Sequence, residues 1–148
     1  TASSTPSPEP EEITSTPSST LTLRYQDQII WTGSVELTST LYHDEINNLN
    51  YQLNTSTVFS ALVLADQQSD TFNISDAQYN AGFDSFYLAC INISPTSTQN
   101  ACYNWNYVVN NNYPSIGMDK YLLNGGENIY IYFSNPWKIT ATTSTSSV

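Results

Sequence analysis

Alternation of large and polar side chains over residues 101–134 constrains the fold more than any other feature of the sequence. In its first half, large side chains occupy every second position, at Tyr103, Trp105, Tyr107 and Val109. In its second half, isoleucine and phenylalanine alternate with tyrosine over residues 129–133, after an Asn-Gly-Gly turn at 124–126. A period of two residues is that of a β-strand. The pattern therefore predicts two aromatic strands joined by a turn-rich connection.

The preceding sequence predicts further strands and one helix. Residues 21–25 and 29–37 read as a hairpin with a turn at 26–28. Ser56 or Thr57 can cap a helix that runs to about Gln67. Residues 84–92 read as a strand, whereas 39–55 are interpreted as a loop and 72–82 as irregular.

These elements predict an α+β fold, a β-grasp-like arrangement of one short helix on a mostly antiparallel sheet of about five strands. Three regions are expected: a Ser/Thr/Pro-rich tail or stalk over 1–20, the folded domain over 21–134, and an extra strand with a Ser/Thr-rich tail over 135–148. The residues expected in the core are Leu23, Ile30, Val35, Val58, Leu62, Phe86, Leu88, Tyr107, Val109, Ile129 and Ile131.

The first twenty residues contain eleven Ser or Thr and four Pro, with Ile13 as the one large apolar side chain. Such a segment cannot bury enough surface to fold alone. Its composition is typical of an extended linker or an O-glycosylated stalk. The candidate O-glycosylation sites in both tails are Thr5, Thr14, Thr16, Thr20, Thr142 and Thr143.

The order of motifs in the second half of the chain resembles a known family. Trp105-x-Tyr107-x-Val109-Asn110, a Pro- and Gly-bearing connection, Tyr121-x-Leu123, a Gly-Gly turn and a last strand are similar to the transcobalamin-like C-terminal domain. The stretch Thr57-Val58-Phe59-Ser60-Ala61-Leu62 resembles that family's short helix. Asn111 departs from the pattern, because the family usually has Gly there.

This resemblance covers roughly residues 20–134 and implies a β-grasp-like architecture. The family is related to the cobalamin-capping β-domain of transcobalamin and intrinsic factor, and it occurs in secreted and surface-attached bacterial proteins of unassigned function. Transcobalamins hold their ligand between two domains, and this chain resembles one of them.

Thirteen acidic residues against three basic ones give the chain a net charge of −10. This charge repels phosphate backbones and anionic lipid surfaces, so nucleic acid is excluded as an expected partner. No stretch approaches the roughly 18 apolar residues of a membrane span, so none is expected in this chain. Because the sequence starts at Thr1 without an apolar leader, we expect a processed chain or a fragment.

Cys90 and Cys102 are the only cysteines. With His43 as the single histidine, they are too few for a closed zinc site, so no metal is expected. Both lie at edges of predicted strands across a short connection, which favours a disulfide over two buried thiols. A disulfide indicates an oxidising compartment, and we expect a secreted or cell-surface protein.

The residues needed for catalysis are largely missing. His43 is the one base that titrates near neutrality, and no Gly-x-Ser-x-Gly motif accompanies it. Asp66, Asp70, Asp76 and Asp84 fall in predicted loops with no apolar pocket around them in sequence. We therefore expect no catalytic residues, no cofactor and no enzymatic activity.

Three Asn-x-Ser/Thr sequons, at Asn54, Asn73 and Asn92, are candidate N-glycosylation sites, with Asn100-Ala-Cys102 as a weak fourth. The aromatic content suggests a second kind of site, a ring platform for a carbohydrate or a cobalamin-like molecule. The residues expected on that face are Trp105, Tyr107, Tyr130 and Tyr132. The alternative is that these rings form the two ordinary sides of a sheet.

An extra strand is expected after Pro136, where Trp137, Ile139 and Ala141 alternate with polar residues. Such a strand needs a partner, either in its own sheet or in a neighbouring copy. The leading hypothesis is a non-enzymatic, glycosylated surface protein that assembles with copies of itself into a filament or surface layer. The alternatives are a ligand-binding or adhesion module, or a domain of a longer surface protein.

Overall fold

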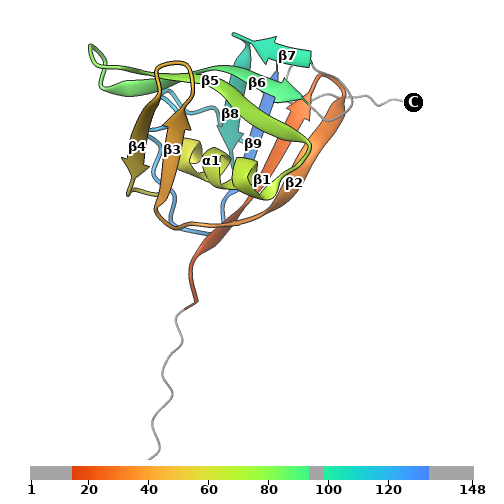
Figure 1. Ribbon diagram of the computed structural model, residues 1–148. Helices are drawn as coiled ribbons and strands as arrows, with labels where there is room; N and C mark the ends of the chain where they lie inside the picture. Colours follow the sequence, from red (N-terminus) through yellow and green to blue (C-terminus); the bar gives the residue numbers. More distant parts are fainter. Residues whose placement is uncertain (1–14, 94–98, 134–148) are drawn as a thin grey trace, which may run out of the picture.

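The computed structural model describes residues 15–93 and 99–133, which form three β-sheets around one helix (Figure 1). The elements in chain order are β1 (Ser18–Tyr25), β2 (Gln28–Glu36), β3 (Thr40–Asp44), β4 (Leu49–Leu53), α1 (Val58–Gln68), β5 (Phe72–Asn80), β6 (Ser85–Ile93), β7 (Gln99–Cys102), β8 (Trp105–Val109) and β9 (Asn128–Phe133).

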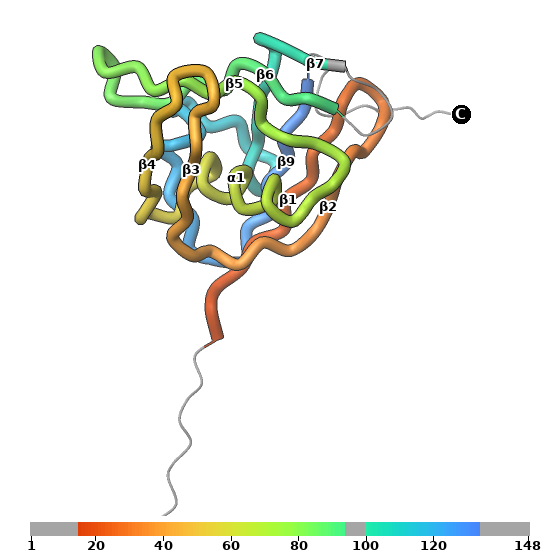
Figure 2. Tube along the Cα trace, viewed as in Figure 1, coloured from red at the N-terminus to blue at the C-terminus, as the bar shows by residue number. Residues whose placement is uncertain are grey.

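The largest sheet has four strands in the order β2-β1-β9-β8. Its central pair joins the first and last described strands in parallel, with Leu21 opposite Ile129 and Leu23 opposite Ile131. Figure 2 shows the same neighbours as orange beside blue. All four of these side chains are at most 1% exposed. The alternating pattern of both strands therefore places their apolar residues in one core, as expected for a half-buried sheet.

Helix α1 begins at a capping box in which the Thr57 side chain accepts from the Ser60 backbone and the Ser60 side chain accepts from the Thr57 backbone. The next two free amides also find acceptors, because Val58 N donates to Tyr121 O at 3.2 Å and Phe59 N to Met118 O at 3.0 Å. The helix contacts β1, β2, β3 and β5. The predicted cap and extent of the helix are confirmed.

Two regions interpreted as non-regular are in fact strands. Residues 39–55 contain the hairpin β3-β4, and residues 72–82 contain β5. The pairing of β5 with β6 shifts register on both sides of Asp76, which interrupts the alternation of apolar residues that would have indicated a strand. In the β3-β4 turn, Asp44 accepts from the amides of Ile46 and Asn47 at 3.0 and 3.2 Å, so the turn is held by its own side chain.

The fold is α+β and dominated by sheet, as predicted, but the expectation of a single sheet of about five strands is wrong. The strands divide into sheets of four, two and three. Of the residues expected in the core, Ile30, Phe86 and Tyr107 are partly buried and pack against it, and the others are buried.

The tails differ in how far the structure describes them. Strand β1 begins at Ser18, so residues 18–20 belong to the sheet rather than to the stalk expected over 1–20. Thr16 and Thr20 are exposed. The other O-glycosylation candidates, Thr5, Thr14, Thr142 and Thr143, lie outside the described residues. So does the expected strand with Trp137, Ile139 and Ala141.

Candidate functional site

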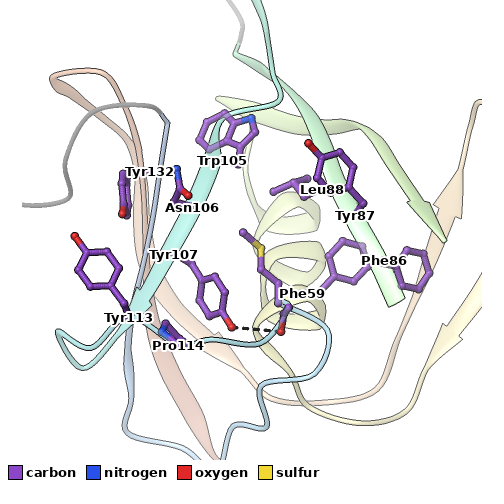
Figure 3. A pocket seen from close by; sticks show the side chains of 12 residues that line it. Phe59, Phe86, Tyr87, Leu88, Trp105, Asn106, Tyr107, Tyr113, Pro114 and Tyr132 are labelled. Carbon is purple, nitrogen blue, oxygen red and sulfur yellow. Dashed lines mark hydrogen bonds between the residues drawn. The ribbon is translucent and has the colours of Figure 1, made fainter. Parts of the chain in front are cut away.

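A cleft with a volume of about 300 Å³ opens between β6 and β8 (Figure 3). Strand β8 lines it with Trp105, Asn106 and Tyr107, and β6 faces them with Phe86, Tyr87 and Leu88. Phe59 of α1 lies between the two strands, and Met118 also lines the cleft. The residues that line the cleft are therefore mostly aromatic, and many of the rings also carry a polar group.

Both strands that flank the cleft leave part of an edge unpaired. Among the strands that the structure describes, β8 lies at the end of its sheet and pairs with β9 alone. Strand β6 pairs with β5 along its length, but with β7 only over residues 90–93. Within the described part of the chain, residues 85–89 of β6 thus have no strand partner on the side toward β8.

The hydrogen-bond pattern shows which backbone groups of β8 face this edge. Asn110 N donates to Asn128 O at 2.9 Å, directly opposite in the antiparallel register. In such a pair, hydrogen-bonded positions alternate with non-bonded ones. Asn106 and Val108 are therefore bonded to β9, and the backbone groups of Trp105 and Tyr107 point to the free edge.

The Cys90–Cys102 disulfide joins directly opposed residues of β6 and β7. Next to it, Tyr103 N donates to Ala89 O at 2.7 Å, and Tyr103 has a φ of 77°. This left-handed residue turns the chain away from β6 and into the pairing with β9. The predicted disulfide is confirmed, and it lies just before the point where the chain leaves β6 for β9.

The floor of the cleft is fixed by hydrogen bonds and ring contacts. Tyr107 Oη donates to Ile116 O at 2.6 Å, with Gly117 O at 3.3 Å. Phe86 stacks on Phe59 with ring centroids 4.8 Å apart. Below them, Asp119 accepts from Phe86 N at 3.0 Å and from Ser85 Oγ at 2.7 Å. The cleft is thus preformed by the fold rather than shaped by flexible side chains.

Two tyrosines of the cleft remain neutral over the whole physiological range. Burial raises the pKa of Tyr107 to about 12. Burial, together with a hydrogen bond to Tyr113, raises the pKa of Tyr132 to about 12 as well. Outside the cleft, the hydrogen bond from Tyr79 and the charge of Lys120, 3.6 Å away, lower the pKa of Asp84. The cleft itself therefore offers hydroxyl and ring contacts rather than charges.

The four residues expected on one aromatic face do not share a face. Trp105 and Tyr107 lie opposite Phe133 and Ile131, whereas Tyr130 and Tyr132 lie opposite Val108 and Asn106 and point to the other side. Three of the four, Trp105, Tyr107 and Tyr132, still line the cleft because it wraps around the edge of β8. Tyr130 does not.

Tyr130 instead lies beside Arg24, whose guanidinium carbon is 5.6 Å from its ring centroid and 5.3 Å from that of Tyr132. The sequence could not show this division, because it follows from the register between β8 and β9 rather than from the alternation within either strand. The sequence also gave no signal that Phe59 and Met118 lie at the same site.

The N-glycosylation candidates occupy different surroundings. Asn54 and Asn73 are exposed and Asn92 is half-buried. Asn73 and Asn92 face each other across β5 and β6, with Asn92 Nδ2 3.4 Å from Asn73 Oδ1, and Asn100 faces Asn92 from β7. Three of the four sequons therefore form one row across the three-stranded sheet.

The candidates for catalysis are scattered. His43 Nδ1 lies 2.7 Å from Asn50 Oδ1 on the exposed side of the β3-β4 hairpin. Asp66 accepts from Ile74 N at 3.0 Å, and burial raises its pKa.

Across residues 15–93 and 99–133, no group of three or more His, Cys, Asp or Glu side chains is placed to hold a metal ion. In the same ranges, no helix has the length and apolar character to cross a membrane.

Comparison with known proteins places these strands in a family. No curated protein sequence matches the chain significantly. The family model described as a domain of unknown function, DUF4430, matches residues 55–135. This range covers α1 and every strand of the cleft, and it is more than half of the 148 residues. DUF4430 is a transcobalamin-like domain family, in agreement with the resemblance in the sequence. The chain therefore belongs to the DUF4430 family of domains of unknown function.

Proposed function

We propose that this protein is a non-enzymatic, extracellular structural domain that assembles with copies of itself into a filament or surface layer. The observation that carries the proposal is a pair of strand edges that no described strand covers, on β8 and on residues 85–89 of β6. On the β6 edge, Phe86 N is bound by Asp119 and Ala89 O by Tyr103 N, so the edge of β8 is the more open of the two. Exposed strand edges are templates for pairing with another chain unless they are covered or charged. Neither edge segment contains a charged residue or a proline.

The sequence supplies a segment suited to such pairing. Residues 137–143, Trp-Lys-Ile-Thr-Ala-Thr-Thr, alternate apolar and polar side chains and contain β-branched residues at four positions. Strand addition between copies is a general mode of association, in which backbone hydrogen bonds give affinity and side-chain pockets give specificity.

The other parts of the proposal have separate support. The Cys90–Cys102 disulfide is typical of proteins from oxidising compartments, which favours a secreted or cell-surface location. The exposed sequon at Asn54 and the Thr-rich tails favour glycosylation. The parallel pairing of β1 with β9, with α1 packed against the sheet, favours a β-grasp-like topology.

Self-assembly is tested by comparing the parent chain with a variant carrying Trp137→Ser and Ile139→Ser. Sedimentation and electron microscopy over a range of protein concentrations should show large assemblies for the parent and monomers for the variant. Added salt should favour assembly, because it screens repulsion between chains of net charge −10. A parent chain that stays monomeric at every concentration and salt would refute the proposal.

A second candidate function is favoured by the aromatic lining of the cleft. A carbohydrate or a cobalamin-like molecule would stack on Trp105 and donate a hydrogen bond to the hydroxyl oxygen of a neutral tyrosine. The test is fluorescence titration of a variant with Trp31→Phe and Trp137→Phe, in which Trp105 is the single tryptophan. Quenching or a spectral shift with glycans or cobalamins would support this function, and an unchanged spectrum at millimolar ligand would exclude it.

A further inference from the structure

We propose that the cleft between β6 and β8 is the acceptor site for strand addition, and that its occupant is residues 137–143 of a second copy of the chain. This inference rests on the proposed self-assembly and specifies where the two copies join. The donated strand would lie along β8 and place alternate side chains in the cleft.

The backbone of β8 is arranged for this pairing. The amide and carbonyl groups of Trp105 and Tyr107 point to the free edge, as the register with β9 requires. At the end of that edge Val109 N already donates to Asn112 O at 3.0 Å, so the available length ends there. The free edge therefore spans residues 105–108 and can pair with part of the segment 137–143.

The cleft also fits the side chains of the donor. If Trp137 and Ile139 point inward, Lys138 and Thr140 point outward, because side chains alternate along a strand. The inward side chains would meet Phe59, Met118 and Leu88. A cavity of about 300 Å³ is at the lower end of the range for ligand pockets, roughly 300–1,000 Å³. It suits one large anchor such as Trp137, while the rest of the strand lies along the edge.

Charge favours this segment over any other part of a second copy. The chain as a whole has a net charge of −10, so two copies repel each other. Residues 137–143 contain no acidic residue and include Lys138, one of only three basic residues in the sequence. Two carboxylates lie at the start of β6, where Asp84 pairs with Lys120 and Asp119 accepts from Ser85. Residues 137–143 thus bring no negative charge to a cleft whose own lining residues are uncharged.

A second copy is a better donor than the chain itself. Strand β9 ends at Phe133, and β8 lies between β9 and the cleft. Trp137 lies four residues beyond Phe133, a reach of about 14 Å at full extension. Two strand spacings already take about 10 Å. The difference leaves little chain to pass over the side chains of β8 before Trp137 reaches the cleft of its own chain. The same segment of another copy is not restricted in this way.

Cysteine cross-linking between two full-length chains tests the site. The acceptor chain carries Asn106→Cys together with Trp137→Ser and Ile139→Ser, so that it cannot donate. The donor chain carries Thr140→Cys, on the same side of the added strand as exposed Asn106. Mixing and mild oxidation should give a heterodimer that disappears on reduction. The matched control acceptor carries Ser34→Cys on β2, the other edge of the sheet, and should give none.

A pair of charge variants provides a second readout that avoids new cysteines. Tyr87→Lys places a cation at the rim of the cleft, where it would repel Lys138 of the donor. Phe83→Lys adds the same charge at the β5-β6 turn. Both side chains are exposed, at 53% and 79%, so both variants should fold. Assembly should be lost for Tyr87→Lys and retained for Phe83→Lys.

The outcomes separate this site from self-assembly in general. If the parent assembles but Ser34→Cys cross-links in place of Asn106→Cys, the acceptor is β2 and the inference is wrong. A chain with both Asn106→Cys and Thr140→Cys that forms only an internal disulfide would show that the segment fills its own cleft, which also overturns the inference. If no assembly and no cross-link is seen, the proposed function fails together with the site.

Discussion

The two halves of β6 have the same neighbour on one side and different surroundings on the other. Both halves pair with β5, but residues 90–93 also pair with β7, whereas residues 85–89 face the cleft. Ile91, in the half that pairs with β7, is fully buried, whereas Tyr87, in the half that faces the cleft, is 53% exposed. One continuous strand is therefore an interior strand at one end and an edge strand at the other.

The difference arises in a neighbouring segment, not in β6. The chain pairs with β6 as far as Tyr103, then turns and pairs with β9 as β8. The disulfide holds the two strands together at the point where they begin to diverge. A cleft between strands can thus be built by one left-handed residue and one covalent bond, without any insertion in the strand that it exposes.

The largest expected difference between the halves is in the cost of truncating a side chain. Ile91→Ala should destabilise the fold by about 4 kcal/mol, because it leaves a cavity in the core. Tyr87→Ala should change stability by less than about 0.5 kcal/mol, as for most exposed positions. Urea unfolding of both variants measures this. Equal losses of unfolding free energy in the two variants would mean that residues 85–89 are covered in solution. The two halves of β6 would then not differ in burial.

Removing the disulfide should have the next largest effect. Cys90 and Cys102 are 12 residues apart, and closing a loop of this size contributes about 3 kcal/mol in the chain-entropy model. The variant with Cys90→Ser and Cys102→Ser should unfold at correspondingly lower urea. Amide hydrogen exchange should show lost protection first at residues 90–93, because the pairing of β6 with β7 then opens more easily. Unchanged exchange at residues 90–93 would show that backbone pairing alone holds β6 and β7 together.

The tyrosines of the cleft should give a pH dependence with a definite sign. The pKa values of Tyr107 and Tyr132 are raised from 10.0 to about 12, so the folded state holds these protons more tightly than the unfolded state does. Their contribution to stability is complete below pH 10 and is lost as the pH rises from about 10 to 12. Absorbance titration should show tyrosines that ionise only near pH 12, and Tyr107→Phe should reduce their number.

Tyr42 provides an internal reference for that titration, because burial raises its pKa to about 12 and it is not among the residues that line the cleft. If the Tyr107→Phe chain shows the same number of late-titrating tyrosines as the parent, then Tyr107 is accessible to solvent and the cleft is wider than described.

The smallest expected effect is at Tyr103, the residue that separates the two halves. Its left-handed conformation costs about 1–2 kcal/mol for a residue other than glycine. Glycine avoids this cost but loses about 0.5–1 kcal/mol through its greater freedom when unfolded. Tyr103→Gly should therefore stabilise the fold by about 0.5 kcal/mol, and Tyr103→Val should destabilise it. Thermal unfolding compares the stability of the two variants. A stabilising effect of Tyr103→Val would mean that the left-handed conformation of residue 103 is not needed.

Much of the local structure was predictable because its causes are local. Thr57 and Ser60 are three residues apart and form the capping box at the start of α1. The alternation over residues 129–133 correctly indicated β9. Strand β5 was missed, because two register shifts around Asp76 break its alternation. The β3-β4 hairpin was missed because polarity does not follow burial in it: Leu41 and Leu49 are exposed, whereas Asp44 is buried.

The candidate site was predictable only in part. The aromatic strands pointed to Trp105 and Tyr107, but Phe59 and Met118 come from elements whose sequences give no sign of their common location. Tyr130 and Tyr132 were expected beside Trp105, and the register of β9 turns both of them to the opposite face.

By itself the sequence determined the class of fold, the helix and its cap, the aromatic strands and the pair of cysteines, because each depends on residues close together in the chain. The tertiary structure alone decided that β1 and β9 pair in parallel, that the described strands divide among three sheets, and that β6 and β8 face each other across a cleft. Register and strand order depend on contacts between distant segments, and alternation within a strand gives its faces but not its neighbours.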